Sequence, residues 1–253
     1  MEYPNVSILM PTYNRPNFLP LITYNLLNMN YDKTKLELCI LDDGKEPLFT
    51  TESLKETKNT LSPLKINYIQ EKTKNTIGAK RNKLVKLAKH KICIMMDDDD
   101  IYFPTYIKHS VETLKLSKSG LVGSNNMLFI YPHHNYKMSK IACGAKRQIH
   151  EATMCFTKKY FRSMPGFEKS SRGEGASMID FNEKNANYTE IENCMVCVSH
   201  KNNSISKEQF YKNRINSKIG NPNYIDILET ISNSKYNPDL TDSDEEVENK
   251  DKS

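Results

Sequence analysis

Apolar residues in the first hundred positions form short runs and helical repeats, and the two kinds of pattern alternate along the chain. The runs at 5–10, 36–41, 66–69 and 92–96 have the length and the polar flanks of buried strands. Between them, apolar residues recur at helical spacing over 18–27, 51–59 and 78–88. This βαβαβαβ order predicts right-handed crossovers and a sheet with helices on both faces. We therefore expect an α/β fold with a mixed, mostly parallel central sheet.

The second half repeats these patterns less regularly. Helices are predicted from Pro104 to residue 117, around 158–161 and from 179 to 185, and strands at 126–131 and 191–199. From Lys207 onward the helical pattern is weak. These patterns predict one domain over 1–206, with halves at 1–104 and 105–206, then a helical extension over 207–238 and a tail over 239–253.

Charge is unevenly distributed. The segment 239–253 has seven acids and two lysines, a net charge of −5, and because the whole chain carries +5 the remainder carries +10. The tail lacks an apolar repeat and is predicted to be disordered. A basic body suits ligands that carry phosphate. Among phosphate-bearing ligands, nucleic acid is the weakest candidate. The lysines are dispersed, and there is no module of interleaved aromatic and basic residues.

The chain has no sequence feature of a membrane or secreted protein. No stretch approaches the roughly 20 apolar residues of a spanning helix, and Met1 leads into the first predicted strand without a signal-peptide core. The six cysteines lie mostly in apolar runs, which is typical of buried, reduced thiols. Cys194 and Cys197 have the spacing of metal ligands but no second pair, so we predict no zinc site. We expect a cytoplasmic protein with no integral membrane segment.

Polar clusters follow three of the predicted strands directly. They are the segment 11–15, the pair Asp42 and Asp43, and the acids at 97–100. Ligands of parallel sheets bind beyond the carboxyl ends of the strands. The three clusters are therefore predicted to meet in one ligand site.

The acids Asp97, Asp98, Asp99 and Asp100 contribute nothing to packing, because like charges this close repel each other. A divalent cation would neutralise them. On an extended backbone Asp97 and Asp99 point the same way and can share one ion, with Asp98 facing away. Carboxylates suit Mg²⁺ or Mn²⁺, which complete their shell with substrate phosphates. The alternative is a solvated loop in which a single acid, such as Asp100, caps the next helix.

The helix predicted from Gly78 begins with Lys80, Arg81 and Lys83. The helix dipole disfavours cations at this end. Free N–H groups together with basic side chains form an anion site, which suggests a diphosphate as ligand. The alternative is a solvated, lysine-rich helix face.

Six short motifs together resemble the GT-A fold glycosyltransferases, most closely family 2, over roughly residues 6–204. In the order of that family they are Pro11-Thr12-Tyr13-Asn14-Arg15, Asp42-Asp43-Gly44, Gly78-Ala79-Lys80-Arg81-Asn82, Asp97-Asp98-Asp99-Asp100 with Pro104, Gly166-Phe167 before Gly173-Glu174, and His200-Lys201-Asn202-Asn203-Ser204. Each motif alone is weak evidence. Their common order, each at the end of a suitable element, is strong evidence.

The resemblance implies a role for each matched position. Thr12, Tyr13 and Asp43 would hold the nucleotide base, and Asp97 would contact the ribose. Arg81, with Arg15 or Lys80, would face the base or the diphosphate. Asp99 would bind the metal, with His200 as a further ligand, and the donor-binding set would also include Pro11, Asp42 and Asp98. Two of these positions have a structural alternative. For Tyr13 it is a role in packing only, and for His200 it is that of an ordinary residue at the end of a strand.

One departure from the family concerns the acceptor side. The family often carries Glu-Asp, whose Asp deprotonates the acceptor hydroxyl, whereas this chain has Glu174-Gly175. An inverting transfer needs a general base opposite the leaving group. Glu174 is the expected base, and Asp180 lies further along the chain. The alternative is that activity is altered or lost.

The expected function is a Mn²⁺- or Mg²⁺-dependent inverting transfer of a sugar from a nucleoside-diphosphate sugar, with UDP as the favoured nucleotide. The acceptor is expected to be a hydroxyl of a glycan or protein-linked glycan. The alternative is a non-catalytic GT-A-like protein that binds a nucleotide sugar or a glycan. Synthesis of sugar nucleotides is disfavoured, because the loop at 11–15 is not rich in glycine.

Overall fold

The computed structural model describes residues 2–117, 119–143, 148–179, 187–201, 203, 206–219 and 221–233. Its helices are α1 (Leu19–Asn28), α2 (Thr51–Leu61), α3 (Ile77–Leu87), α4 (Tyr106–Leu116), α5 (Lys158–Ser163) and α6 (Pro222–Asn233). Its strands are β1 (Val6–Thr12), β2 (Leu36–Asp42), β3 (Lys65–Gln70), β4 (Ile92–Met95), β5 (Ile101–Tyr102), β6 (Leu121–Gly123), β7 (Asn126–Tyr131), β8 (Lys137–Ala142), β9 (Cys155–Thr157), β10 (Asn187–Tyr188), β11 (Met195–Val198) and β12 (Arg214–Lys218).

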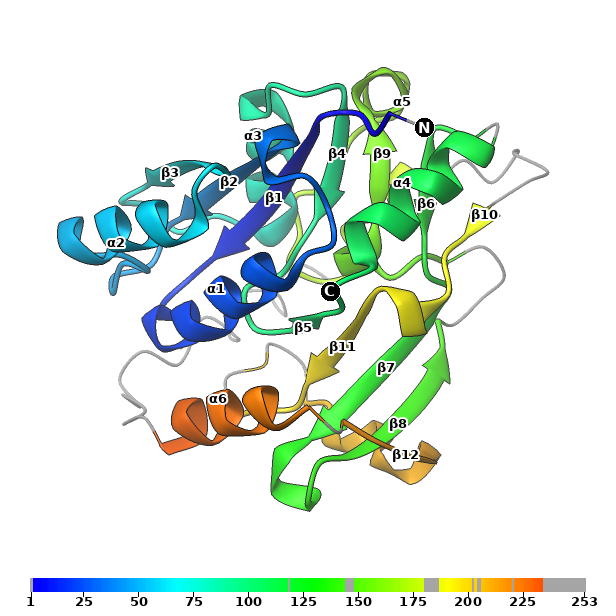
Figure 1. The fold of residues 1–253 in the computed structure, drawn as a ribbon. Coiled ribbons are helices and arrows are strands. Elements are labelled where there is room, and N and C mark those ends of the chain that lie inside the picture. The colour runs from blue at the N-terminus through cyan, green and yellow to red at the C-terminus, as the bar shows by residue number, and fades with distance from the viewer. Residues whose placement is uncertain are drawn as a thin grey trace, which may run out of the picture.

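The central sheet has the strand order β10-β6-β9-β4-β1-β2-β3 (Figure 1). The neighbours β4, β1, β2 and β3 are parallel, as the alternation of strands and helices predicted. Only β9 runs against its two neighbours, β4 and β6. The predicted mixed, mostly parallel sheet is therefore confirmed. A second sheet of order β12-β8-β7-β11-β5 lies below it in Figure 1.

Helices cover both faces of the central sheet, because the strands are apolar on both sides. In β1, Ile8 and Met10 belong to one buried cluster, which also includes residues of α1 and α4. Leu9, which points the other way, belongs to a second cluster with Leu84 and Val85 of α3. Period-2 alternation thus buries β1 between two helical layers.

The first strand is longer than predicted. β1 continues through Pro11 to Thr12 and pairs with β2 over its whole length, whereas its pairing with β4 ends at Leu9 and Met95. Pro11 lies beyond the last pair with β4, so its missing N–H costs no hydrogen bond on that side.

Other differences fall in the second half. The apolar segment 191–199 is a 3-10 helix, Ile191–Asn193, followed by β11, rather than one strand. The extension predicted to be helical contains a strand, β12, which pairs with β8. The division into a domain, an extension and a tail remains a prediction. Asp180, the predicted helix to residue 185 and the acidic tail lie outside the described residues.

Five of the six cysteines are buried, as their apolar surroundings predicted, and Cys143 is partly exposed. Within the described ranges, the helices are too short or too polar to cross a lipid bilayer.

Candidate active site

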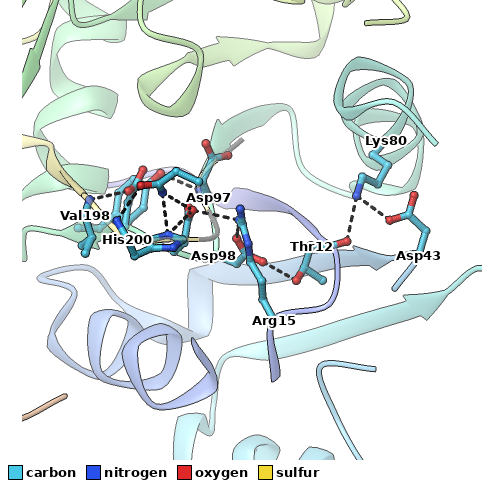
Figure 2. Close-up of polar contacts among 12 residues, drawn as sticks. Thr12, Arg15, Asp43, Lys80, Asp97, Asp98, Val198 and His200 are labelled. Carbon is cyan, nitrogen blue, oxygen red and sulfur yellow. Dashed lines mark hydrogen bonds and ion pairs between the residues drawn. The ribbon is translucent and has the colours of Figure 1, made fainter. Parts of the chain in front are cut away.

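The carboxyl ends of β1, β2 and β4 bring the three predicted polar clusters together (Figure 2). The Thr12 hydroxyl donates to Asp98 over 2.5 Å, which joins the end of β1 to the acid loop at 97–100. Lys80 Nζ donates to the backbone oxygen of Thr12 over 2.9 Å and to Asp43 Oδ1 over 2.7 Å. The prediction that these strand ends meet is confirmed.

The acid loop turns at Asp98 and Asp99 instead of continuing as an extended strand. The turn is held from behind, because the Asp97 N–H donates to the Tyr102 hydroxyl over 2.7 Å and Asn25 Nδ2 donates to the Asp100 backbone oxygen over 2.9 Å. The four carboxylates therefore point in different directions.

Each carboxylate of the acid loop has its own partner in the protein. Asp97 lies 3.1 Å from Arg81 Nη2, Asp98 2.5 Å from Arg15 Nη1, Asp99 2.9 Å from His200 Nε2 and Asp100 3.4 Å from Lys207 Nζ. Asp97 and Asp99 thus have separate partners within the protein, and the binding of a divalent cation to this cluster remains a prediction. Basic side chains from distant segments balance much of the charge.

Asp98 lies inside the site, between the end of β1 and Arg15. Its side chain is 1% exposed, whereas that of Asp97 is 26% exposed. The same Arg15 nitrogen also lies 3.1 Å from Asp99. Asp98 therefore holds Arg15 beside Asp99, and Asp97 is the acid most accessible to a ligand.

Asp99 and His200 are the side chains best suited to hold a metal ion. Arg15 and the hydrogen bond from His200 outweigh the effect of burial and hold the pKa of Asp99 well below its ordinary value. Burial lowers the pKa of His200 although Asp99 opposes this, which favours the neutral imidazole, the form that binds metal ions. The backbone N–H of His200 donates to Asn203 Oδ1 over 2.8 Å, which fixes the loop that carries His200.

One carboxylate and one imidazole fit a Mn²⁺ or Mg²⁺ ion that takes its other ligands from a bound diphosphate. In the part of the chain that the structure describes, no three His, Cys, Asp or Glu side chains converge to form a metal site alone.

The predicted base-binding residues surround the Lys80–Asp43 pair. Lys80 and Asp43 are each only 3% exposed, and the second Asp43 oxygen accepts from the Asn75 N–H over 2.6 Å. The Tyr13 ring lies beneath Lys74 Nζ, 4.7 Å from the ring centroid. Lys80 is used to hold Asp43 against the end of β1, which argues against a direct contact between Lys80 and a diphosphate.

Asp42 and Pro11 are buried parts of the framework. Asp42 accepts from the Gly44 and Leu48 N–H groups over 2.9 and 2.7 Å and from the Tyr68 hydroxyl over 2.7 Å. Its side chain is therefore occupied in shaping the loop after β2. The prediction that Asp42 contacts the nucleotide directly is not supported by this position.

The start of α3 is not the open anion site that the sequence predicted. The Gly78 N–H donates to the Ser170 backbone oxygen over 2.9 Å, and the Ile77 N–H donates to Ser171 Oγ over 3.3 Å. The Ala79 N–H is taken by the Thr76 hydroxyl over 3.3 Å. A Cβ on Gly78 would lie 1.7 Å from the Glu168 backbone oxygen, so glycine is needed for this close contact.

Arg81 links the donor side of the site to Glu174. Arg81 Nε lies 3.2 Å from Glu174 Oε1, and Arg81 Nη2 lies 3.1 Å from Asp97. The Arg81 Nη1 atom is buried without a hydrogen-bond partner among the described residues. A buried donor of this kind is normally satisfied, by a water molecule or by a ligand.

Four residues of the site had no clear signal in the sequence: Lys207, Asn203, His150 and Glu151. Lys207 begins the weakly helical extension, yet its side chain is 15% exposed and lies against Asp100. Asn203 lies in the motif at 200–204, but the family resemblance implies no role for it. His150 and Glu151 precede β9, and nothing in their local pattern distinguishes them from a loop.

Because His150 is buried, we expect the free energy of unfolding to fall in acid. Burial lowers its pKa from 6.5 to about 3, with Lys207 and Arg81 adding to the effect. Below the unfolded-state pKa the unfolded chain binds a proton that the folded chain does not, so the free energy of unfolding falls as pH drops from 6.5 toward 3. We expect His150→Gln to reduce the loss of stability between about pH 7 and about pH 4 by about 2–3 kcal/mol, measured by urea unfolding.

The control for this measurement is His90→Gln, since His90 is only half-buried and its side chain makes no hydrogen bond within the described ranges. It should leave the pH dependence of unfolding as in the parent chain. An unchanged pH dependence in His150→Gln would contradict the low pKa.

Comparison with known proteins identifies the family. The model of the family described as "Glycosyl transferase family 2" matches residues 7–174. The chain belongs to glycosyl transferase family 2. The match spans β1, the acid loop and Glu174, so these features lie in the family's own domain.

A curated protein matches this family 2 chain in sequence. An uncharacterized glycosyltransferase of Rickettsia bellii is 28% identical over 183 residues, 66% of this chain and 26% of that protein. The chain therefore spans about a quarter of the length of this curated relative.

Two solved glycosyltransferase structures share the fold. The mannosyltransferase PcManGT from Pyrobaculum calidifontis, determined with GDP-Man and Mn²⁺, has a TM-score of 0.61 at 16% identity over 92% of this chain and 70% of its own. Residues 1–349 of S. aureus TarS have a TM-score of 0.56 at 15% identity over 77% of this chain and 60% of TarS 1–349. At these identities the likeness concerns the fold alone.

Proposed function

We propose that this family 2 chain transfers a sugar, with inversion, from a nucleoside-diphosphate sugar to a hydroxyl of a glycan or protein-linked glycan. The observation that carries the proposal is the Asp99–His200 pair, 2.9 Å apart beyond the end of β4, with Arg15 3.1 Å from Asp99. This arrangement combines metal-ligating atoms with a fixed cation, which is what a departing diphosphate requires.

The donor lies across the carboxyl ends of β1, β2 and β4. Tyr13 and Asp43 receive the base, Asp97 receives the ribose, and Arg15 faces the diphosphate. Uracil is the base expected here. S. aureus TarS, a structure with the same fold, has been determined with UDP-GlcNAc, whereas PcManGT was determined with GDP-Man.

Asp99 and His200 would hold the Mn²⁺ or Mg²⁺ ion. When bound, the ion supplies positive charge that stabilises the diphosphate as it departs. Arg15 is held by Asp98 at 2.5 Å and adds a second positive charge at the same place. Because these groups are fixed before the reaction, they need little rearrangement as the negative charge develops.

The acceptor enters on the side of Arg81 that carries carboxylates. An inverting reaction needs one of them to take the proton of the attacking hydroxyl. Glu174, the residue expected from the sequence, lies here and is 4% exposed. Glu151 contacts the same loop, because its side chain lies against Gly175.

A donor screen tests the proposed function. UDP-sugars and GDP-sugars are incubated with the full chain, with Mn²⁺, with Mg²⁺ or with EDTA, and release of the nucleoside diphosphate is measured. We expect release from one donor class, dependent on the metal and stimulated by a hydroxyl acceptor.

The non-catalytic alternative gives a different result. Calorimetric binding of a nucleotide sugar without release of the diphosphate, across a varied panel of glycan acceptors, would favour a binding protein. Release that is unaffected by EDTA would contradict the role of the metal.

A further inference from the structure

Gly175 leaves a space that the side chain of Glu151 fills. A Cβ at position 175 would lie 2.4 Å from Glu151 Cγ and 3.3 Å from Glu151 Cδ. The backbone of Gly175 has φ −83° and ψ −9°, which any residue can adopt. Glycine is therefore present at 175 because of this contact and not because of its conformation.

The backbone at Glu151 is well anchored. Glu151 begins the 3-10 helix Glu151–Thr153 (η4), which lies against β4 and Tyr102. The Tyr102 hydroxyl accepts from the Asp97 N–H over 2.7 Å and donates to the Ala152 backbone oxygen over 3.2 Å. One tyrosine thus connects η4 to Asp97, and the Met95 N–H donates to the Met154 backbone oxygen over 2.9 Å.

The environments of Glu151 and Glu174 differ in a way that matters for proton transfer. The Glu174 side chain is 6% exposed and lies against Arg81 Nε at 3.2 Å. Glu151 is partly exposed, and its carboxylate has no hydrogen bond or ion pair to another described residue. A general base must come within hydrogen-bond distance of the hydroxyl that it deprotonates. Glu151 is the more accessible of the two carboxylates to an incoming hydroxyl.

Electrostatic interactions also connect the two carboxylates. Burial raises the pKa of Glu174, Arg81 opposes this, and the charge of Glu151 adds to the rise. Asp97, Glu174 and Glu151, in that order, raise the pKa of Arg81 against the effect of burial. Three carboxylates thus surround one guanidinium, and the acceptor side of the site has an excess of negative charge.

We propose that Glu151 is the general base of the transfer and that Glu174 is a positioning residue that holds Arg81. The proposal rests on the function proposed above. The acceptor O–H proton moves to the Glu151 carboxylate while the acceptor oxygen forms a bond to the anomeric carbon. The bond from that carbon to the diphosphate oxygen breaks, and its electron pair leaves with the nucleoside diphosphate.

Isosteric variants distinguish the two roles. The kcat and the donor KM of nucleoside diphosphate release are measured by donor titration at saturating Mn²⁺ for Glu151→Gln and Glu174→Gln, and the dissociation constant of the nucleoside diphosphate is measured by calorimetry. We expect Glu151→Gln to lower kcat by roughly 10²-fold or more with unchanged nucleotide affinity. Glu174→Gln frees Arg81 and is expected to change donor KM and nucleotide affinity more than kcat.

The control is Glu56→Gln. Glu56 is exposed on α2, so this variant makes the same chemical change away from the site. It should match the parent chain in all three measurements. A kcat of Glu151→Gln equal to that of the parent would overturn the proposal. A parent chain that releases no nucleoside diphosphate from any donor would overturn the proposed function, and the proposal with it.

Moving the carboxylate provides a second test. Gly175→Asp alone is expected to lose turnover, because its Cβ would meet the Glu151 stem at 2.4 Å. Glu151→Ala removes the base and this contact, which is the closest, and leaves the flexible end of Met154, whose Cε would lie 2.8 Å from the same Cβ. The double variant Glu151→Ala/Gly175→Asp returns a carboxylate to this space and should exceed Glu151→Ala in kcat by roughly tenfold. A double variant no more active than Glu151→Ala, with a parent-like unfolding midpoint, would overturn the proposal.

Discussion

Asp99→Asn is expected to lower the rate of nucleoside diphosphate release by at least roughly 10³-fold, about 4 kcal/mol in the activation free energy. Asparagine keeps the shape of the side chain but removes the charge. Asp99 is held ionised by Arg15 and His200, and it supplies the only carboxylate of the Asp99–His200 pair. The measurement is the rate of release at saturating donor over a Mn²⁺ titration. The Mn²⁺ concentration for half-maximal rate should rise as well.

Asp226→Asn is the matched control, since Asp226 is exposed on α6. It should leave both the rate and the Mn²⁺ dependence unchanged. Arg15 remains paired with Asp98 at 2.5 Å in Asp99→Asn, so the fold of the site should persist. Unfolding midpoints of both variants check this point. Full activity in Asp99→Asn would exclude the assigned metal site.

Lys80→Met is expected to lower the free energy of unfolding by about 3–5 kcal/mol, because it leaves the Asp43 carboxylate buried without its cation. The side chains of Lys80 and Asp43 are 4% and 0% exposed. Lys80 also donates to the Thr12 backbone oxygen over 2.9 Å, so the end of β1 loses a contact. Urea unfolding followed by circular dichroism measures the change.

Lys83→Met is the matched control on the same helix. Lys83 pairs with Glu71 over 2.7 Å, but the two side chains are 42% and 28% exposed. Exposed pairs contribute little, so the expected loss is below about 1 kcal/mol. The double variant Asp43→Asn/Lys80→Met should lose less than the sum of its single variants. Equal losses in Lys80→Met and Lys83→Met would show that burial of the Lys80 pair has no special effect on stability.

The sequence correctly predicted the elements whose signals are local. Apolar alternation in β1, β2 and β4 marks strands buried on both faces, and the helical repeats between them mark α1, α2 and α3. The βαβ order then implies parallel pairing, so the position of Asp43 and Asp97 at one edge of the sheet follows without further information.

Elements with weak local signals were missed. β5 has two residues, β8 and β12 lie in polar segments, and β11 is preceded by a 3-10 helix that looks like the same apolar run. The two edge strands of the second sheet, β5 and β12, take their structure from the neighbours they pair with. Those neighbours are far away in the sequence, as Lys137 and Lys218 are.

The sequence by itself determined the order of the motifs, the parallel half of the sheet and the edge at which the acids lie, because periodicity and strand order depend on nearby residues. Only the tertiary structure decided the partner of each acid, since His200 and Lys207 come to Asp99 and Asp100 from a hundred residues away. It also decided that the loop at 168–174 occupies the N–H groups of Ile77 and Gly78 at the start of α3. The contact between Glu151 and Gly175 has the same origin, because shape complementarity between distant segments leaves no repeat in the sequence.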